Sequence, residues 1–122
     1  SVAYRGLGHV ALHQNKFQKA LGYYKKYSIV HPEDLSIALA IGNVYFALKK
    51  YALALSWYKK CLTVRELRAS AYVNSANVYE KAGKRHLSKQ CARFALKLLE
   101  RKHDARSRML KKRMRMLLDS LS

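Results

Sequence analysis

Residues 35–68 read LSIALAIGNVYFALKKYALALSWYKKCLTVRELR, and residues 1–34 before them share this pattern at an offset of 34 residues. Residues 69–102 repeat it a second time with weaker identity. The matching positions of the first two stretches are mostly small, aromatic or basic: Gly8, Val10, Lys16, Ala20, Leu21, Tyr24, Lys25, Lys26 and Val30 recur as Gly42, Val44, Lys50, Ala54, Leu55, Tyr58, Lys59, Lys60 and Val64. A period of this length indicates stacked supersecondary units that share a continuous core.

Each repeat has the periodicity of two helices. Apolar or small residues recur at i, i+3, i+4 and i+7 in the first half of a unit, as in Ala38, Ile41, Gly42 and Tyr45, and a similar stripe follows in the second half. The pattern breaks at residues 14–16, 49–50 and 82–84, where two antiparallel helices have to turn. The chain has one proline, Pro32, and lacks the frequent turn residues of β folds. An all-α fold is predicted.

The pattern resembles the tetratricopeptide repeat, whose signature is W-x2-L-G-x2-Y, then A-x3-F, then P. Unit two has the most complete version. The three versions are Tyr4-x2-Leu7-Gly8 with Ala20-x3-Tyr24 and Pro32, Ala38-x2-Ile41-Gly42-x2-Tyr45 with Ala54-x3-Tyr58, and the degenerate Tyr72-x2-Ser75-Ala76-x2-Tyr79 with Ser88-x3-Ala92. The small residues suit positions where the two helices of a unit cross closely. The resemblance implies an α-solenoid of three helix hairpins.

The expected organisation is repeat 1 at residues 1–34, repeat 2 at 35–68, a degenerate repeat 3 at 69–102, and a basic amphipathic capping helix at 103–122. Leu110 stands where the first repeats have glycine, so the motif does not continue there. An apolar stripe in the last segment would cover the third repeat: Leu110, Met114, Leu117, Leu118 and Leu121. The chain opens on Ser1 with no cap before repeat 1, so we expect it to belong to a longer protein or larger complex.

Composition limits the classes of function. The chain of 122 residues carries 25 Lys and Arg against 7 acids, a formal charge of +18, which favours acidic or polyanionic partners. Cys61 and Cys91 form no CxxC pair, which favours an intracellular compartment, cytoplasmic or nuclear. The longest apolar stretch falls short of the roughly 20 residues that a membrane-spanning helix needs, so no integral membrane segment is expected. No phosphate loop, nucleophile elbow or acid pair appears, so neither an enzyme nor a cofactor is predicted.

The predicted function is a protein–protein interaction scaffold. The resemblance implies a concave groove, lined by the first helix of each unit, that binds a peptide, a helix or a subunit of a larger assembly. The candidate contact residues are Arg5, His9, Asn43, Asn74 and Asn77. Asparagine amides offer a donor and an acceptor to an extended peptide, although they can also be polar residues on a solvated helix face.

Two more specific sites are not expected. Relatives that clamp a C-terminal carboxylate use Lys, Asn and Arg at positions that match Arg5, His9, Ala40, Ser70 and Asn74 here, and only Arg5 keeps the positive charge. His9 and His13 have the i, i+4 spacing of a zinc site, but no third ligand is apparent.

The alternative function is binding of RNA or another polyanion through the basic outer face and the last helix. Its candidate anchors are Arg108, Lys112 and Arg115, within a basic run that also includes Arg106, Lys111 and Arg113. A solvated helix face, an acidic protein partner and a membrane surface remain open for the same residues. No RNA-reading motif with exposed aromatic residues is evident.

Overall fold

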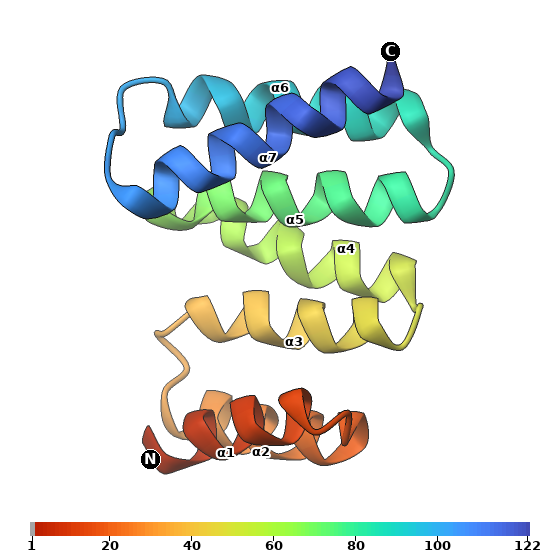
Figure 1. Ribbon diagram of the computed structural model, residues 1–122. Coiled ribbons are helices and arrows are strands. Elements are labelled where there is room, and N and C mark those ends of the chain that lie inside the picture. The colour runs from red at the N-terminus through yellow and green to blue at the C-terminus, as the bar shows by residue number, and fades with distance from the viewer. Residues whose placement is uncertain (1) are drawn as a thin grey trace. The chain divides into compact units, whose positions relative to one another are not determined.

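The computed structural model describes residues 2–122, which form seven α-helices and contain no β-strand (Figure 1). The all-helical prediction is therefore confirmed for this range. The helices are α1 (Val2–His13), α2 (Phe17–Val30), α3 (Ser36–Ala47), α4 (Tyr51–Lys60), α5 (Arg68–Lys81), α6 (Arg85–Leu99) and α7 (Ala105–Leu121). Two short 3-10 turns, η1 (Cys61–Thr63) and η2 (Arg65–Leu67), lie between α4 and α5.

The chain forms two compact units, residues 1–61 and residues 62–122. In the first unit α1 packs on α2, α2 on α3, and α3 on α4. In the second unit α5 packs on α6, and α7 lies against α6 (Figure 1). The first unit therefore contains two antiparallel hairpins, and the second contains one hairpin and the single helix α7.

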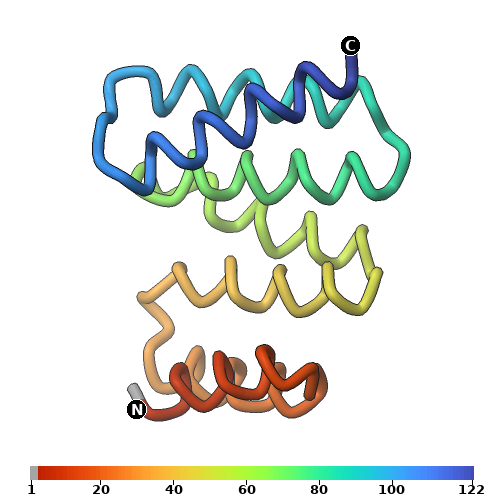
Figure 2. Tube along the Cα trace, viewed as in Figure 1, coloured from red at the N-terminus to blue at the C-terminus, as the bar shows by residue number. Residues whose placement is uncertain are grey.

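The three hairpins turn at equivalent positions, which Figure 2 shows as tight reversals of the trace. Asn15, Lys49 and Gly83 are 34 residues apart and have positive φ angles of 59°, 61° and 77°. The amide of the following lysine donates back to the end of the first helix, at 2.8 Å for Lys16 to Ala11 O and 2.9 Å for Lys50 to Tyr45 O. This is the Schellman pattern that ends a helix on a left-handed residue.

In each hairpin of the first unit, the two helices cross closely because a glycine on the first helix faces a tyrosine on the second. A Cβ built on Gly8 would lie 2.4 Å from Cε1 of Tyr24, and one on Gly42 would lie 2.4 Å from Cε1 of Tyr58. Both tyrosines are fully buried. The predicted close crossing at small residues is confirmed, since Ala20 and Ala54 on the facing helices are also fully buried.

The third hairpin uses a different pair at the same place. Ala76 stands in the glycine position and Ala92 in the tyrosine position, and both are fully buried. Ser88, also fully buried, donates its hydroxyl to the Ala76 carbonyl at 2.9 Å, so its polar group is satisfied inside the core. The gain of a methyl group on α5 thus accompanies the loss of the large ring on α6.

Helix α7 completes the core of the second unit. Asp104 caps its first turn by accepting from the Ser107 amide at 3.1 Å and the Ser107 hydroxyl at 2.7 Å. The predicted apolar stripe is confirmed: Leu110, Met114, Leu117 and Leu121 are buried in one cluster with residues of α5 and α6, and Leu118 packs against it half-buried. At the other end of α7, the Arg85 guanidinium donates to the Leu121 carbonyl.

Candidate functional site

The predicted contact residues fall on the first helix of each hairpin. Arg5 and His9 lie on α1 and Asn43 lies on α3, all in the first unit. Asn74 and Asn77 lie on α5 in the second unit. His9 and Asn43 are exposed, whereas Arg5, Asn74 and Asn77 are half-buried. The structure therefore presents two sets of polar side chains, one in each unit.

His9 and Asn43 occupy the same place in successive repeats and make the same kind of contact. The Tyr24 hydroxyl lies 2.6 Å from His9 Nδ1, and the Tyr58 hydroxyl donates to Asn43 Oδ1 at 2.5 Å. Each tyrosine therefore fills the helix crossing with its ring and reaches an exposed polar residue with its hydroxyl. This fixes the orientation of both exposed side chains, which the repeat pattern alone did not reveal.

The imidazole of His9 is held in its neutral form. Partial burial, together with the positive charges of Arg5 and His13, lowers its pKa below the usual 6.5. Burial also raises the pKa of the Tyr24 hydroxyl, so the proton stays on that oxygen. At neutral pH the pair is therefore an uncharged hydrogen-bonding group on α1.

Asn77 has a different environment because the third hairpin has lost the tyrosine. The equivalent partner position is Ala92, and Asn77 instead lines a cavity of about 360 Å³ between α5 and α7. The other lining residues are Glu80, Arg113, Met114, Met116, Leu117 and Ser120. Met116 is 61% exposed, so an apolar side chain of this cavity faces solvent. The repeat pattern does not predict that α7 lines a cavity beside Asn77.

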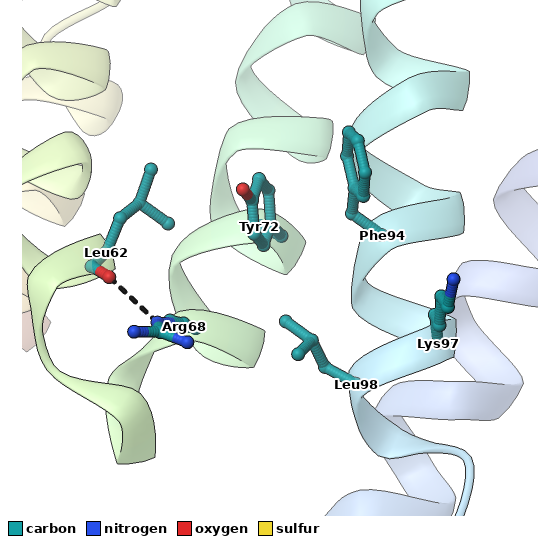
Figure 3. Close-up of a pocket in the computed structure, with 6 residues that line it drawn as sticks. All are labelled: Leu62, Arg68, Tyr72, Phe94, Lys97 and Leu98. Atoms are coloured by element: carbon teal, nitrogen blue, oxygen red, sulfur yellow. Dashed lines mark hydrogen bonds between the residues drawn. The ribbon is translucent and has the colours of Figure 1, made fainter.

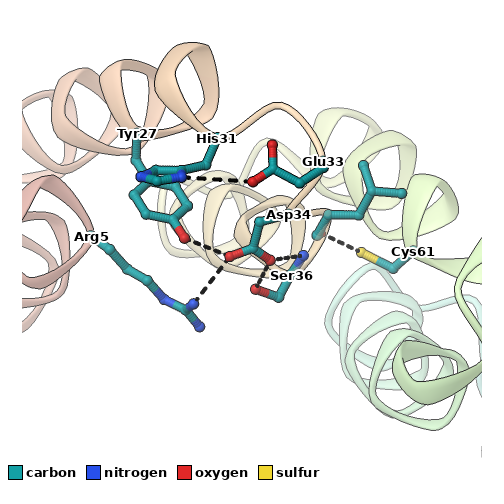
Figure 4. A network of polar contacts seen from close by, with 8 residues as sticks. Arg5, Tyr27, His31, Glu33, Asp34, Ser36 and Cys61 are labelled. Carbon is teal, nitrogen blue, oxygen red and sulfur yellow. Dashed lines mark hydrogen bonds and ion pairs between the residues drawn. The ribbon is translucent and has the colours of Figure 1, made fainter. Parts of the chain in front are cut away.

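Arg5 is held by its own unit (Figure 4). Its Nη1 lies 3.4 Å from Asp34 Oδ2, which also accepts from the Tyr27 hydroxyl at 2.6 Å. Asp34 Oδ1 accepts from the Ser36 amide at 3.1 Å and the Ser36 hydroxyl at 2.5 Å, so it caps the start of α3. The hydrogen bonds from Ser36 and Tyr27, with the charge of Arg5, lower the pKa of Asp34. The positive charge of Arg5 is thus compensated inside the fold.

The exposed basic residues of α7 have different surroundings. Arg108, Lys112 and Arg115 are exposed, as predicted for a basic surface. Arg108 Nη1 donates to the His103 carbonyl at 2.5 Å, so part of this side chain is engaged by its own loop. Arg115 lines a shallow hollow with Leu96, Lys97 and Glu100.

Lys111 corrects the prediction of a continuous basic run. Only 7% of it is exposed, and its Nζ donates to the Lys102 carbonyl at 2.6 Å. Its aliphatic stem therefore covers the core while its charge holds the loop before α7. Lys111 is a structural residue and does not belong to the exposed surface.

Other kinds of site are not supported by the described part of the chain. Across residues 2–122, no three His, Cys, Asp or Glu side chains come close enough together to hold a metal ion. No helix in this range has both the length and the apolar character to cross a bilayer. Cys61 and Cys91 are free thiols, and burial raises the pKa of Cys61 to about 11, so that thiol stays protonated.

Comparison with known proteins agrees with this geometry. The tetratricopeptide repeat model matches residues 35–66. No curated protein sequence matches the chain. Among solved structures, the Yersinia enterocolitica type III secretion chaperone SycD in complex with a peptide of the translocator YopD has a TM-score of 0.85 at 16% identity, covering 98% of this chain and 89% of that one.

Two further structures extend the likeness beyond bacterial chaperones. The N-terminal domain of stress-induced protein-1 from C. elegans has a TM-score of 0.73 at 27% identity, covering 95% of this chain and 92% of that one. The first repeat domain of Spaghetti (RPAP3), bound to the HSP90 peptide SRMEEVD, has a TM-score of 0.75 at 19% identity, covering 98% and 91%. Residues 35–66 therefore match the tetratricopeptide repeat, and nearly the whole chain shares the fold of these repeat-domain structures.

Proposed function

We propose that the chain is a protein–protein interaction scaffold whose first-helix faces, on α1, α3 and α5, bind a peptide or helix of another protein within a larger assembly. The observation that carries this proposal is the recurrence of one polar position, His9, Asn43 and Asn77, once in each hairpin. The first two are exposed and oriented by buried tyrosine hydroxyls. Groups oriented before binding lose less conformational freedom when a partner arrives, which favours recognition.

Proteins of the same fold support the choice of a peptide as ligand. SycD is described in complex with a peptide of YopD, and the Spaghetti domain is described bound to a peptide of HSP90. The similarity to these structures concerns the fold alone, so the binding chemistry is argued from the polar residues of this chain. Hydrogen bonding by histidine and asparagine suits a peptide backbone or polar side chains. No catalytic group is needed for this role.

Recognition of a terminal carboxylate is not part of the proposal. Arg5 is the one basic residue at the positions that match the carboxylate clamp, and it is already paired with Asp34 at 3.4 Å. Releasing Arg5 would leave Asp34 without that partner. We therefore propose that internal segments are bound through polar contacts, while the net charge of +18 favours an acidic partner and speeds its association.

RNA or another polyanion remains an outcome of the test. Arg108, Lys112 and Arg115 are exposed, but two of the structures of similar fold described above have peptides as ligands. The free thiols agree with a reducing cytoplasmic or nuclear compartment, which we propose as the place of binding.

Site-specific photocrosslinking tests the proposal. The crosslinker p-benzoylphenylalanine is placed at Ala47, an exposed position one turn after Asn43 on α3, or at Ala52, an exposed position on α4. Both variants are incubated with cell lysate at low and high salt, and the products are identified by mass spectrometry. We expect one protein to crosslink from position 47 at both salt concentrations and not from position 52.

The opposite result would favour the polyanion. In that case no protein crosslinks from position 47, RNA is recovered at low salt only, and recovery is lost in an Arg108→Glu/Lys112→Glu variant. Phosphate contacts give this salt dependence because binding releases counterions from the nucleic acid.

A further inference from the structure

A second pocket lies beside the α5–α6 hairpin (Figure 3). Its volume is about 360 Å³, and it is lined by Leu62, Arg68, Tyr72, Phe94, Lys97 and Leu98. This is near the lower end of the roughly 300–1,000 Å³ typical of ligand pockets, so it suits one or two side chains of a partner. Neither Asn74 nor Asn77 lines it.

Two apolar side chains at this pocket are exposed. Phe94 is 47% exposed and Leu98 is 40% exposed, both on α6. The ring of Phe94 faces that of Tyr72 on α5, with centroids 5.2 Å apart and planes tilted by 31° (Figure 3). The two rings therefore form an aromatic wall, and Leu98 adds an aliphatic one. Phe94 and Leu98 lie one helical turn apart on α6, so their exposed apolar surfaces adjoin at the pocket.

The other repeats show that folding does not require an aromatic residue at position 94. The equivalent residues in the first two repeats are Lys26 and Lys60. Lys26 holds its Nζ 5.7 Å from the centroid of the Tyr4 ring, and Tyr4 is the equivalent of Tyr72. A lysine thus covers the tyrosine in the first repeat, whereas the third repeat places an exposed phenylalanine there. This substitution gives the third repeat an apolar surface that a lysine would have kept solvated.

The charges at the pocket are all positive. Arg68 Nε donates to the Leu62 carbonyl at 2.9 Å, which fixes the guanidinium at the pocket (Figure 3). Lys97 is the other charged lining residue, and no lining residue is acidic. The fitting partner therefore combines an apolar side chain with carboxylates. A second copy of this chain is a poor fit, because two chains of charge +18 repel each other.

We propose that this pocket docks a short acidic segment of a partner protein. An aromatic or leucine side chain of the segment packs between Tyr72, Phe94 and Leu98, and flanking Asp or Glu residues pair with Arg68 and Lys97. The pocket is separate from the polar positions of the proposed peptide-binding face. If the pocket does not dock such a segment, the proposal for the peptide-binding face still stands. If that face binds no peptide, the proposal for the pocket still stands.

Peptide display tests the proposal with a set of ligands that is not biased towards any one partner. A random dodecapeptide library is selected on the wild-type chain and depleted on a Phe94→Lys variant, which restores the residue type of the first two repeats. Circular dichroism and thermal unfolding check that the variant is folded. We expect enriched peptides to carry an apolar residue flanked by Asp or Glu, and to lose at least about tenfold in affinity on Phe94→Lys and on Lys97→Glu.

Two matched controls keep the result specific. Ile29→Lys alters an apolar side chain that is 78% exposed on α2, and Lys25→Glu reverses an exposed charge on the same helix. Both should bind the selected peptides like wild type. Enriched peptides that bind Phe94→Lys as tightly, or that carry no acidic residues, would overturn the proposal. So would the absence of any peptide that prefers the wild type. Sedimentation tests the remaining occupant, since self-association that disappears in Phe94→Lys would assign the pocket to a second copy of the chain.

Discussion

The ring of Tyr58 occupies the space that the missing side chain of Gly42 leaves open. A Cβ on Gly42 would lie 2.4 Å from Cε1 of Tyr58, and the hydroxyl of the same tyrosine donates to Asn43 at 2.5 Å. One buried residue therefore determines both how closely α3 and α4 cross and how the exposed asparagine is oriented.

A double-mutant cycle at this pair should show strong coupling. Gly42→Ala forces the buried ring to move, and overpacking of this kind costs about 1–3 kcal/mol in the free energy of unfolding. Tyr58→Ala alone should cost about 3–5 kcal/mol. In the Tyr58→Ala background the added methyl no longer clashes, so Gly42→Ala should stabilise the helix by about 0.5–1 kcal/mol. Urea denaturation of the four proteins measures the coupling, and simple additivity would contradict the account.

His9 should make the stability of the fold depend on pH. Its pKa in the folded chain is lower than the ordinary 6.5, so the unfolded chain takes up a proton more readily. The stabilisation is complete above pH 6.5 and is lost as the pH falls through 6.5 towards the lowered pKa. Unfolding free energies near pH 7.5 and pH 5 should therefore differ less in His9→Asn than in wild type. His86→Asn, an exposed position on α6, is the control and should behave like wild type.

The left-handed turn positions give a stability prediction with an internal control. Lys49 adopts φ 61° where the third hairpin has Gly83 at φ 77°. A non-glycine residue in this conformation costs about 1–2 kcal/mol, so Lys49→Gly should raise the free energy of unfolding by about 1 kcal/mol, and Gly83→Ala should lower it by a similar amount. Lys50→Gly is the matched control, because Lys50 has φ −93° and should gain nothing. A stabilisation by Lys50→Gly equal to that of Lys49→Gly would show that the backbone argument is wrong.

Neighbouring lysines on α7 should respond differently to truncation. Lys111→Ala removes a buried stem and the hydrogen bond to the Lys102 carbonyl, with an expected loss of about 1–3 kcal/mol in the free energy of unfolding. Lys112→Ala alters an exposed side chain and should stay within about 0.5 kcal/mol of wild type. Thermal unfolding of the two variants compares them directly. Equal effects would mean that Lys111 does not hold the loop before α7.

Much of the fold could be predicted because a repeat displays the same physical constraint several times. The turn positions Asn15, Lys49 and Gly83 coincide with the predicted breaks, and Gly8 and Gly42 with the predicted close crossings. The hairpins and the stripe on α7 follow from helical periodicity, since one face of each helix must be buried.

The contacts of individual polar side chains could not be predicted in the same way. The sequence places Lys111 in the basic run of the last helix, but its partner is a carbonyl in the irregular segment before α7. Arg5 lies on α1, and Asp34 follows α2. Whether the two side chains meet depends on how α2 packs, which the sequence pattern does not specify. The sequence pattern does not predict the pocket at Phe94, because a phenylalanine within a helical apolar pattern is usually core. Its exposure becomes visible only when α5 and α6 are packed.

The proposed contact between the first-helix face of α3 and a protein partner can be measured directly. The most direct measurement is the affinity of the crosslinked partner segment for wild type, Ala47→Arg and Ala52→Arg, titrated by fluorescence anisotropy at low and high salt. We predict a loss of at least about tenfold for Ala47→Arg, wild-type affinity for Ala52→Arg, and a weak dependence on salt. Equal affinity of the two variants, or a steep loss of binding with salt, would contradict the claim.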